Sequence, residues 1–126
     1  MKTEHPVKDE ESAHPIPHVL RPVLKQIVKQ FIDGDYSLQK IEGQVAPVSP
    51  TTARHIENNI ADYGETLIEL PDETWSTSVS QWMIINWELV VDLWTAEAGR
   101  SDLVLNARVC EKEGGFEFIV DSVHVP

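Results

Sequence analysis

Residues 87–109 read WELVVDLWTAEAGRSDLVLNARV, and this stretch decides the fold. Apolar and polar residues alternate up to Thr95 and again from Asp102 onward, which is typical of half-buried β-strands. Between the two runs, Gly99 supplies the backbone freedom that a tight turn needs. The stretch therefore predicts an antiparallel pair of strands with one apolar and one polar face.

The flanking sequence extends this pair to a sheet of about four strands. The strand-like runs are Thr66–Leu70, Trp82–Thr95, Asp102–Glu111 and Phe116–Val125. Pro71 ends the first run, and a break is expected near Asn86 in the second. Residues 112–115 (KEGG) predict a hairpin turn between the last two runs.

Two helices are expected before these strands. Apolar pairs repeat every four residues over 17–33, and Gly34 is placed to end that helix. A second helix should begin at Ser49 and end at Gly64, with a loop and a short strand near Lys40–Val45 before it. The fold class is therefore α+β, with two N-terminal helices packed on one face of a mainly antiparallel sheet.

A chain of 126 residues fits one domain, which we expect to span residues 16–126. Residues 1–15 are polar and acidic and contain Pro6 and Pro15, so they predict a disordered arm. No secretory signal and no membrane-length apolar run are visible in the sequence. We therefore expect a cytoplasmic protein with no membrane partner.

The charge is strongly negative and uneven. The formal net charge is −11, and residues 65–126 hold twelve acids against three bases. Nucleic acid is excluded as a direct partner, because binding phosphates needs clustered Lys and Arg. The acidity either serves solubility alone or attracts a basic partner.

Strand alternation assigns two faces to the predicted sheet. One face should carry Trp87, Leu89, Val91, Leu93, Leu103, Leu105, Ala107, Val109, Phe116, Phe118 and Val120. The other should carry Glu88, Val90, Asp92, Trp94, Asp102, Val104, Asn106, Arg108, Cys110, Glu117, Ile119, Asp121 and Val123. The second face mixes acids with aliphatic side chains, which indicates either an interface or a solvated sheet rich in β-formers.

Motifs for chemistry are absent from the sequence: it has no glycine-rich phosphate loop, no paired-cysteine motif and no nucleophile elbow. Asp92, Glu97, Arg100 and Asp102 form the one cluster with catalytic residue types. Their position around a turn predicts solvent access, so we expect Arg100 to pair with a neighbouring acid or the cluster to recognise a partner. We expect no metal, no cofactor and no enzymatic activity.

The pattern D-L-W-T-x-E-x-G-R-S-D-L over Asp92–Leu103 resembles the signature of a small uncharacterised bacterial family, and Ile119–Val125 resembles that family's last strand. The resemblance covers about residues 17–125 and implies no activity and no functional residues. In size and charge, the chain is also similar to bacterial immunity proteins, which neutralise a toxin by binding it.

The leading hypothesis is therefore a non-enzymatic, immunity-type inhibitor whose acidic face binds a basic partner such as a toxin domain. The expected partner-binding residues are Glu88, Asp92, Trp94, Glu97, Arg100, Asp102, Arg108, Glu117 and Asp121. Trp94 would be the aromatic anchor. Self-association through this face is less favoured, because five acids would meet five acids.

The alternative is a pocket between helices and sheet that binds a small ligand or a substrate. The expected element order resembles α+β folds of the nuclear-transport-factor-2 type, and Tyr36, Trp75 and Trp82 would line the pocket. The predicted inner face departs from that type because it carries no polar cluster.

Overall fold

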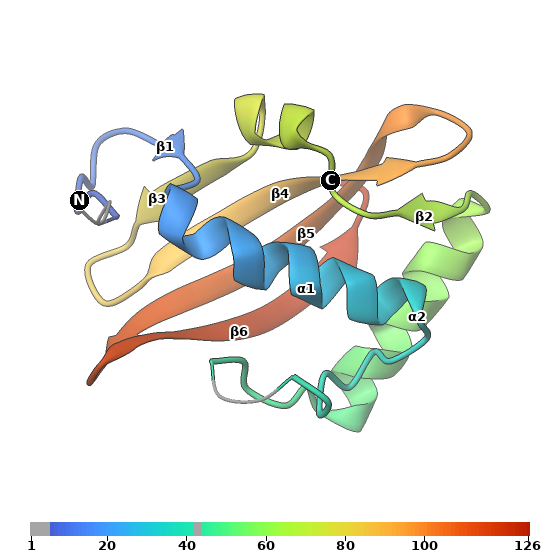
Figure 1. The fold of residues 1–126 in the computed structure, drawn as a ribbon, viewed down its shortest axis with the longest axis horizontal. Helices are drawn as coiled ribbons and strands as arrows, with labels where there is room; N and C mark the ends of the chain where they lie inside the picture. Colours follow the sequence, from blue (N-terminus) through green and yellow to red (C-terminus); the bar gives the residue numbers. More distant parts are fainter. Residues whose placement is uncertain (1–5, 42–43) are drawn as a thin grey trace.

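An antiparallel sheet organises the chain (Figure 1). The computed structural model describes residues 6–41 and 44–126, and this part contains six strands. They are β1 (His14–Pro15), β2 (Leu67–Ile68), β3 (Val79–Trp82), β4 (Trp87–Thr95), β5 (Gly99–Lys112) and β6 (Gly115–His124). Their order is β1-β3-β4-β5-β6, and β2 pairs with the far end of β4.

The helices lie where the sequence predicted them. Helix α1 (Arg21–Ile32) follows a 3₁₀ turn, η1 (His18–Leu20), and crosses one side of the sheet (Figure 1). Helix α2 (Pro50–Tyr63) begins at Ser49, whose Oγ accepts a hydrogen bond of 3.2 Å from the Thr52 N–H. Within the described residues, no helix combines the length and apolar character needed to cross a membrane.

The predicted α+β class with a mainly antiparallel sheet is confirmed, but the strand number is wrong. The described chain has six strands where about four were expected, and β1 precedes α1, so the helices are not both N-terminal elements. Both β1 and β2 are two residues long, too short to show a periodicity. At the break near Asn86 the chain reverses, because β3 and β4 pair as a hairpin.

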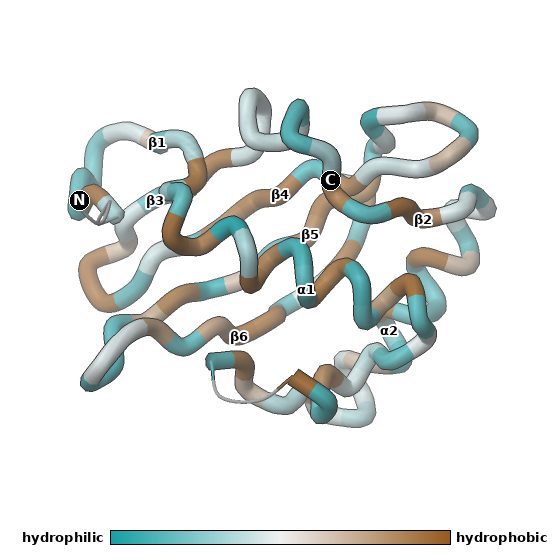
Figure 2. Tube along the Cα trace, viewed as in Figure 1, coloured by the Kyte–Doolittle hydropathy of each residue, from teal (hydrophilic) through white to brown (hydrophobic). Residues whose placement is uncertain are grey.

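The core lies between α1 and the facing side of the sheet. Leu24, Ile27 and Val28 of α1 are fully buried, as are Trp87 and Val91 of β4. Apolar stretches of the central strands lie beneath α1 in Figure 2. Each such side chain contributes roughly 1.5–3 kcal/mol when it is removed from water. The predicted inner face is confirmed at ten of its eleven positions, and Phe116 is partly buried against the core.

A bulge in β6 changes which side chains reach the core. Ala107 pairs with Val120 and Asn106 with Ser122, so Asp121 is an extra residue on β6. Beyond the bulge the alternation is shifted by one residue. Val123 is therefore fully buried, and the prediction that it lies on the polar face is wrong.

The outer edge of β6 is protected by segments from elsewhere in the chain. Ala46 N–H donates to the Phe118 carbonyl at 2.9 Å, and Phe118 N–H donates to the Gln44 carbonyl at 2.7 Å. Asn59 of α2 donates its Nδ2–H to the Val123 carbonyl at 2.8 Å. These bonds occupy groups that would otherwise form an open sheet edge. Part of the strand expected near residues 40–45 falls on residues 42–43, outside the described residues.

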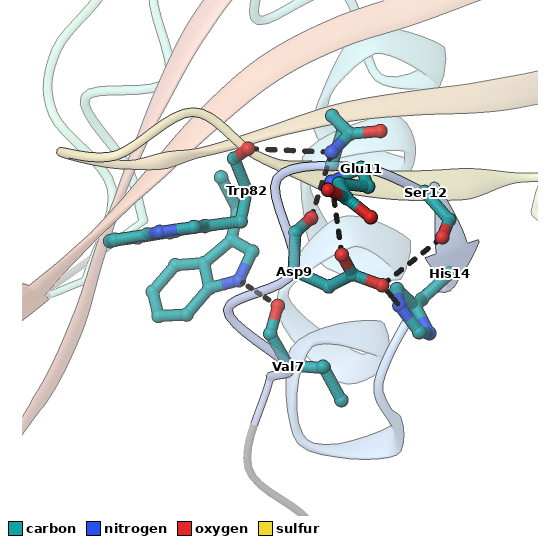
Figure 3. Close-up of polar contacts among 8 residues, drawn as sticks. Val7, Asp9, Glu11, Ser12, His14 and Trp82 are labelled. Atoms are coloured by element: carbon teal, nitrogen blue, oxygen red, sulfur yellow. Dashed lines mark hydrogen bonds and ion pairs between the residues drawn. The ribbon is translucent and has the colours of Figure 1, made fainter.

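Residues 6–15, here called the strap, run along β3 and β4 although we expected them to be disordered. The Trp87 Nε1–H donates to the Val7 carbonyl at 3.0 Å, and Gln81 Nε2 donates to the Asp9 carbonyl at 2.9 Å. In Figure 3 the Asp9 carboxylate accepts hydrogen bonds from the Glu11 N–H, the Ser12 hydroxyl and His14 Nε2. The strap is therefore a packed segment of the domain, while residues 1–5 of the expected arm lie outside the described residues.

Candidate binding face

The side of the sheet opposite α1, here called the outer face, is where most of the expected partner-binding residues lie. Strand pairing aligns Val79, Val90, Asn106 and Ser122 in one row, and Gln81, Glu88, Arg108 and Ile119 in the next. Val79 and Val90 are 36% and 37% exposed, and Glu88 and Asp121 are exposed as well. The rows therefore place an open aliphatic pair beside carboxylates.

Arg108 and Asp121 form an ion pair on this face. Arg108 Nη2 lies 2.8 Å from Asp121 Oδ1, and Nε lies 2.9 Å from Oδ2. The hydrogen bonds to Asp121 and its charge raise the pKa of Arg108, and the charge of Glu88 adds a smaller effect. Both side chains are 40% exposed, so the pair contributes at most about 1 kcal/mol. Its main effect is to leave Glu88 as the unneutralised acid of this group.

A hollow of about 310 Å³ opens beside this pair. Its lining includes Val79, Gln81, Glu88, Val90, Asn106 and Asp121. Within the described chain, Asn106 Oδ1 is buried and has no hydrogen-bond partner. Asp121 is already paired with Arg108, so the Glu88 carboxylate and the free Asn106 amide oxygen are the acceptors left in the hollow, which suits one positively charged N–H donor.

Trp94 lies at the other end of the outer face, where it supports the β4–β5 turn. It is half-buried, and a Cβ at Gly99 would meet its ring at 3.6 Å. Gly99 has φ +73°, which favours glycine. Trp94 also lines a hollow of about 400 Å³ together with Glu73, Thr77 and Arg100. The indole therefore packs against the turn and is not a fully exposed anchor.

Glu97 stabilises the turn between β4 and β5, but its partner is not Arg100, which we expected. The Glu97 carboxylate accepts hydrogen bonds from the Thr66 N–H at 2.7 Å and from Thr66 Oγ1 at 2.9 Å. These bonds lower the pKa of Glu97. Across the described residues, Arg100 makes no ion pair within 4 Å. Arg100 is therefore exposed and available at the rim of the outer face.

Asp92 and Asp102 also have roles in the fold. The Asp92 carboxylate accepts a hydrogen bond from Thr77 Oγ1 at 2.5 Å. The Asp102 N–H donates to the Tyr63 hydroxyl at 3.0 Å, while its carboxylate is exposed. Both line a hollow of about 490 Å³ with Arg100. Two acids and one arginine line this hollow, so it carries charges of both signs.

The nine expected residues therefore fall into separate groups. Glu88 and Asp121 line the first hollow, and Arg108 is paired with Asp121 beside it. The turn end holds Asp92, Trp94, Arg100 and Asp102. Glu97 points to Thr66, and Glu117 pairs with Lys112 at 3.5 Å. Sequence reasoning missed Val79 and Gln81, because β3 is too polar and too short to be recognised as a strand.

Comparison with known proteins identifies the family. The model of a domain of unknown function, DUF7668, matches residues 28–126. The chain belongs to this family. No curated protein and no solved structure matches the chain. The DUF7668 region includes every outer-face residue discussed above, whereas the strap and the first part of α1 precede it.

The aromatic residues expected to line a pocket pack in three different contacts of the DUF7668 domain. Tyr36 stacks on Phe31 with ring centroids 5.8 Å apart, and burial, together with the charge of Glu57, raises the pKa of Tyr36. The Arg21 guanidinium lies 5.2 Å from the Trp75 ring centroid. Trp82 lies on Trp87, with centroids 4.6 Å apart. These side chains thus help to fill the core and its margin.

The histidines and the cysteine of the DUF7668 chain occupy scattered positions. His14 Nε2 lies 2.9 Å from Asp9 Oδ2, and Cys110 is half-buried on the outer face. Among the residues that the structure describes, no three His, Cys, Asp or Glu side chains are grouped as metal ligands. His5 lies outside the described residues.

Proposed function

We propose that the protein is a non-enzymatic binding domain that holds a basic protein partner against its outer face. An immunity-type inhibitor of a bacterial toxin, acting in the cytoplasm, is the form of this function that we favour. The observation that carries the proposal is the hollow of about 310 Å³ between the exposed Val79–Val90 pair and the acids Glu88 and Asp121. This combination resembles an interface, where apolar contact area lies beside polar groups that orient the partner.

The charges define the partner's chemistry. A Lys or Arg side chain entering the hollow would meet Glu88, Asp121 and the Asn106 amide oxygen. The net charge of −11 would speed its approach, because long-range attraction raises association rates. Such attraction weakens with salt, since the Debye length falls to about 8 Å at physiological ionic strength.

Charge reversal in the hollow tests this proposal. The full chain is immobilised, proteins from the source organism are captured at low salt, and the recovered protein is purified and titrated calorimetrically. Glu88→Lys with Asp121→Lys should weaken binding by at least tenfold, which corresponds to about 1.4 kcal/mol. The affinity of the unaltered protein should fall as salt rises from about 50 to about 200 mM.

A matched control separates local from overall charge. Asp33→Lys with Glu57→Lys changes the net charge equally, but Asp33 is the exposed C-cap residue of α1 and Glu57 is exposed on α2. This control should retain most of the affinity. Equal loss in both variants would show that overall charge is responsible, and unchanged binding after reversal in the hollow would contradict the proposal.

A further inference from the structure

The turn between β3 and β4, here called the hairpin tip (Met83–Asn86), presents three consecutive large apolar side chains to water. Met83, Ile84 and Ile85 are 46%, 67% and 79% exposed. Single exposed aliphatic residues are normal, but a contiguous group indicates an interaction site or an aggregation risk. The hairpin tip therefore requires an explanation that core packing does not supply.

The backbone of the hairpin tip is strained as well. The Ile85 N–H donates to the Met83 carbonyl at 2.9 Å, which closes a three-residue turn around Ile84. Ile84 has φ +75°, an outlier for a β-branched residue. Turns with this geometry are rare, and hairpins that need positive φ normally use Gly, Asn or Asp. An isoleucine here lowers stability and solubility together, and such strain is typical of functional positions.

The base of the hairpin tip is rigid enough to maintain this strain. Trp82 and Trp87 pair directly below it, and Asn86 is 8% exposed. The strap fixes the tryptophan pair from one side, because Lys8 Nζ lies 5.0 Å from the Trp82 ring centroid and 2.6 Å from a Glu111 carboxylate oxygen. The apolar side chains therefore project from a fixed platform, which reduces the entropy lost on binding.

The geometry points to the hairpin tip as an apolar anchor that inserts into an apolar pocket of the same basic protein partner. This inference rests on the proposed function. The net charge of −11 repels a second copy and an anionic lipid surface. Three side chains can bury less than the roughly 800 Å² per partner that a stable interface buries. The hairpin tip must therefore form part of a larger interface. Gln81 and Glu88 connect the hairpin tip to the outer face. They form the second cross-strand pair of β3 and β4 counted from the turn, directly after Trp82 and Trp87.

Polar replacement at the hairpin tip gives a test with two opposite readouts. Ile84→Asn removes the apolar group and suits a positive φ, so the melting temperature should rise by about 3 °C or more. The same variant, and Ile85→Ser, should each weaken calorimetric binding of the partner recovered above by tenfold or more. Ile32→Ser removes an apolar side chain that is 39% exposed at the end of α1, away from the outer face, and it should leave binding unchanged.

Each result bears on one of the two proposals. If the hairpin-tip variants bind normally while reversal at Glu88 and Asp121 weakens binding, the anchor is wrong and the outer-face proposal stands. If the tip variants lose binding and charge reversal has no effect, the outer-face proposal fails instead. If no captured protein needs the hairpin tip for binding, the proposal that the tip is an anchor is overturned.

Other occupants of the tip are tested without the partner. Light scattering after gel filtration would detect a dimer, and co-sedimentation with neutral phosphatidylcholine vesicles would detect lipid binding. Either behaviour in the unaltered protein, if Ile85→Ser abolishes it, overturns the basic protein partner as the occupant.

Discussion

At the scale of single residues, Asp92 shows how side chains complete the edge of β4. This residue lies between Val90, which pairs with β3, and Trp94, which pairs with β2. Its carbonyl accepts a hydrogen bond of 2.6 Å from Thr74 Oγ1, and its N–H donates to Ser78 Oγ at 3.0 Å. Two buried hydroxyl groups thus act in place of a neighbouring strand, as backbone groups at a covered edge require.

Removal of the Thr74 hydroxyl should destabilise the protein measurably. Thr74→Val keeps the side-chain shape but leaves the Asp92 carbonyl without its donor, so the free energy of unfolding should fall by about 1–3 kcal/mol in urea titrations. Thr77→Val is the matched control, because the Thr77 hydroxyl bonds the Asp92 carboxylate at an exposed position. Equal losses in the two variants would contradict this account.

At Glu97 the sequence pointed to a residue of the turn but not to its partner. We expected Arg100 to pair with a neighbouring acid, Glu97, Asp92 or Asp102. The structure shows Glu97 bonded to Thr66, which is 31 residues earlier in the chain. Spacing along the chain can suggest a neighbour in a turn, but it carries no signal for a partner brought close by β2 pairing with β4.

At the scale of elements, the strap is organised by the carboxylate of Asp9. Hydrogen bonds from His14, from the Glu11 N–H and from the Ser12 hydroxyl lower the pKa of Asp9 from 3.8 to about 2. Because the folded-state pKa lies below the ordinary value, the charged carboxylate stabilises the strap at pH values above 3.8. This contribution is lost as the pH falls through about 2.

The titration of Asp9 can be followed directly by NMR of its carboxyl carbon. We expect a midpoint near 2 in the intact protein, and a higher midpoint in His14→Ala, because His14 supplies the largest of the stabilising bonds. A midpoint near 3.8 in the intact protein would show that these bonds are not made in solution.

At the scale of the whole molecule, the strap lies outside the family match yet contacts its aromatic residues. The match begins at residue 28, whereas Val7 and Lys8 contact Trp82 and Trp87. The core itself begins at Ile16, which is fully buried. We infer that the strap covers a domain whose fold is otherwise built from the residues that follow it.

Deletion of residues 1–12 should therefore leave a folded but less stable chain. The tryptophan emission should shift to longer wavelength, because Trp82 and Trp87 lose their cover, and the melting temperature should fall by about 4 °C per kcal/mol lost. Circular dichroism should retain the signal of the sheet. An unchanged emission spectrum, or a chain that no longer folds, would contradict this division of roles.

The sequence by itself determined the α+β class, the helix bounds near Ser49 and Gly64, and the inner face of β4 and β5. Periodicity, capping residues and turn residues act over a few neighbouring positions, so they can be read locally. The tertiary structure decided the strand β3, the bulge at Asp121 that buries Val123, the packed strap and the hollow on the outer face. Each of these depends on contacts between residues far apart in the chain, whose register and neighbours no local pattern specifies.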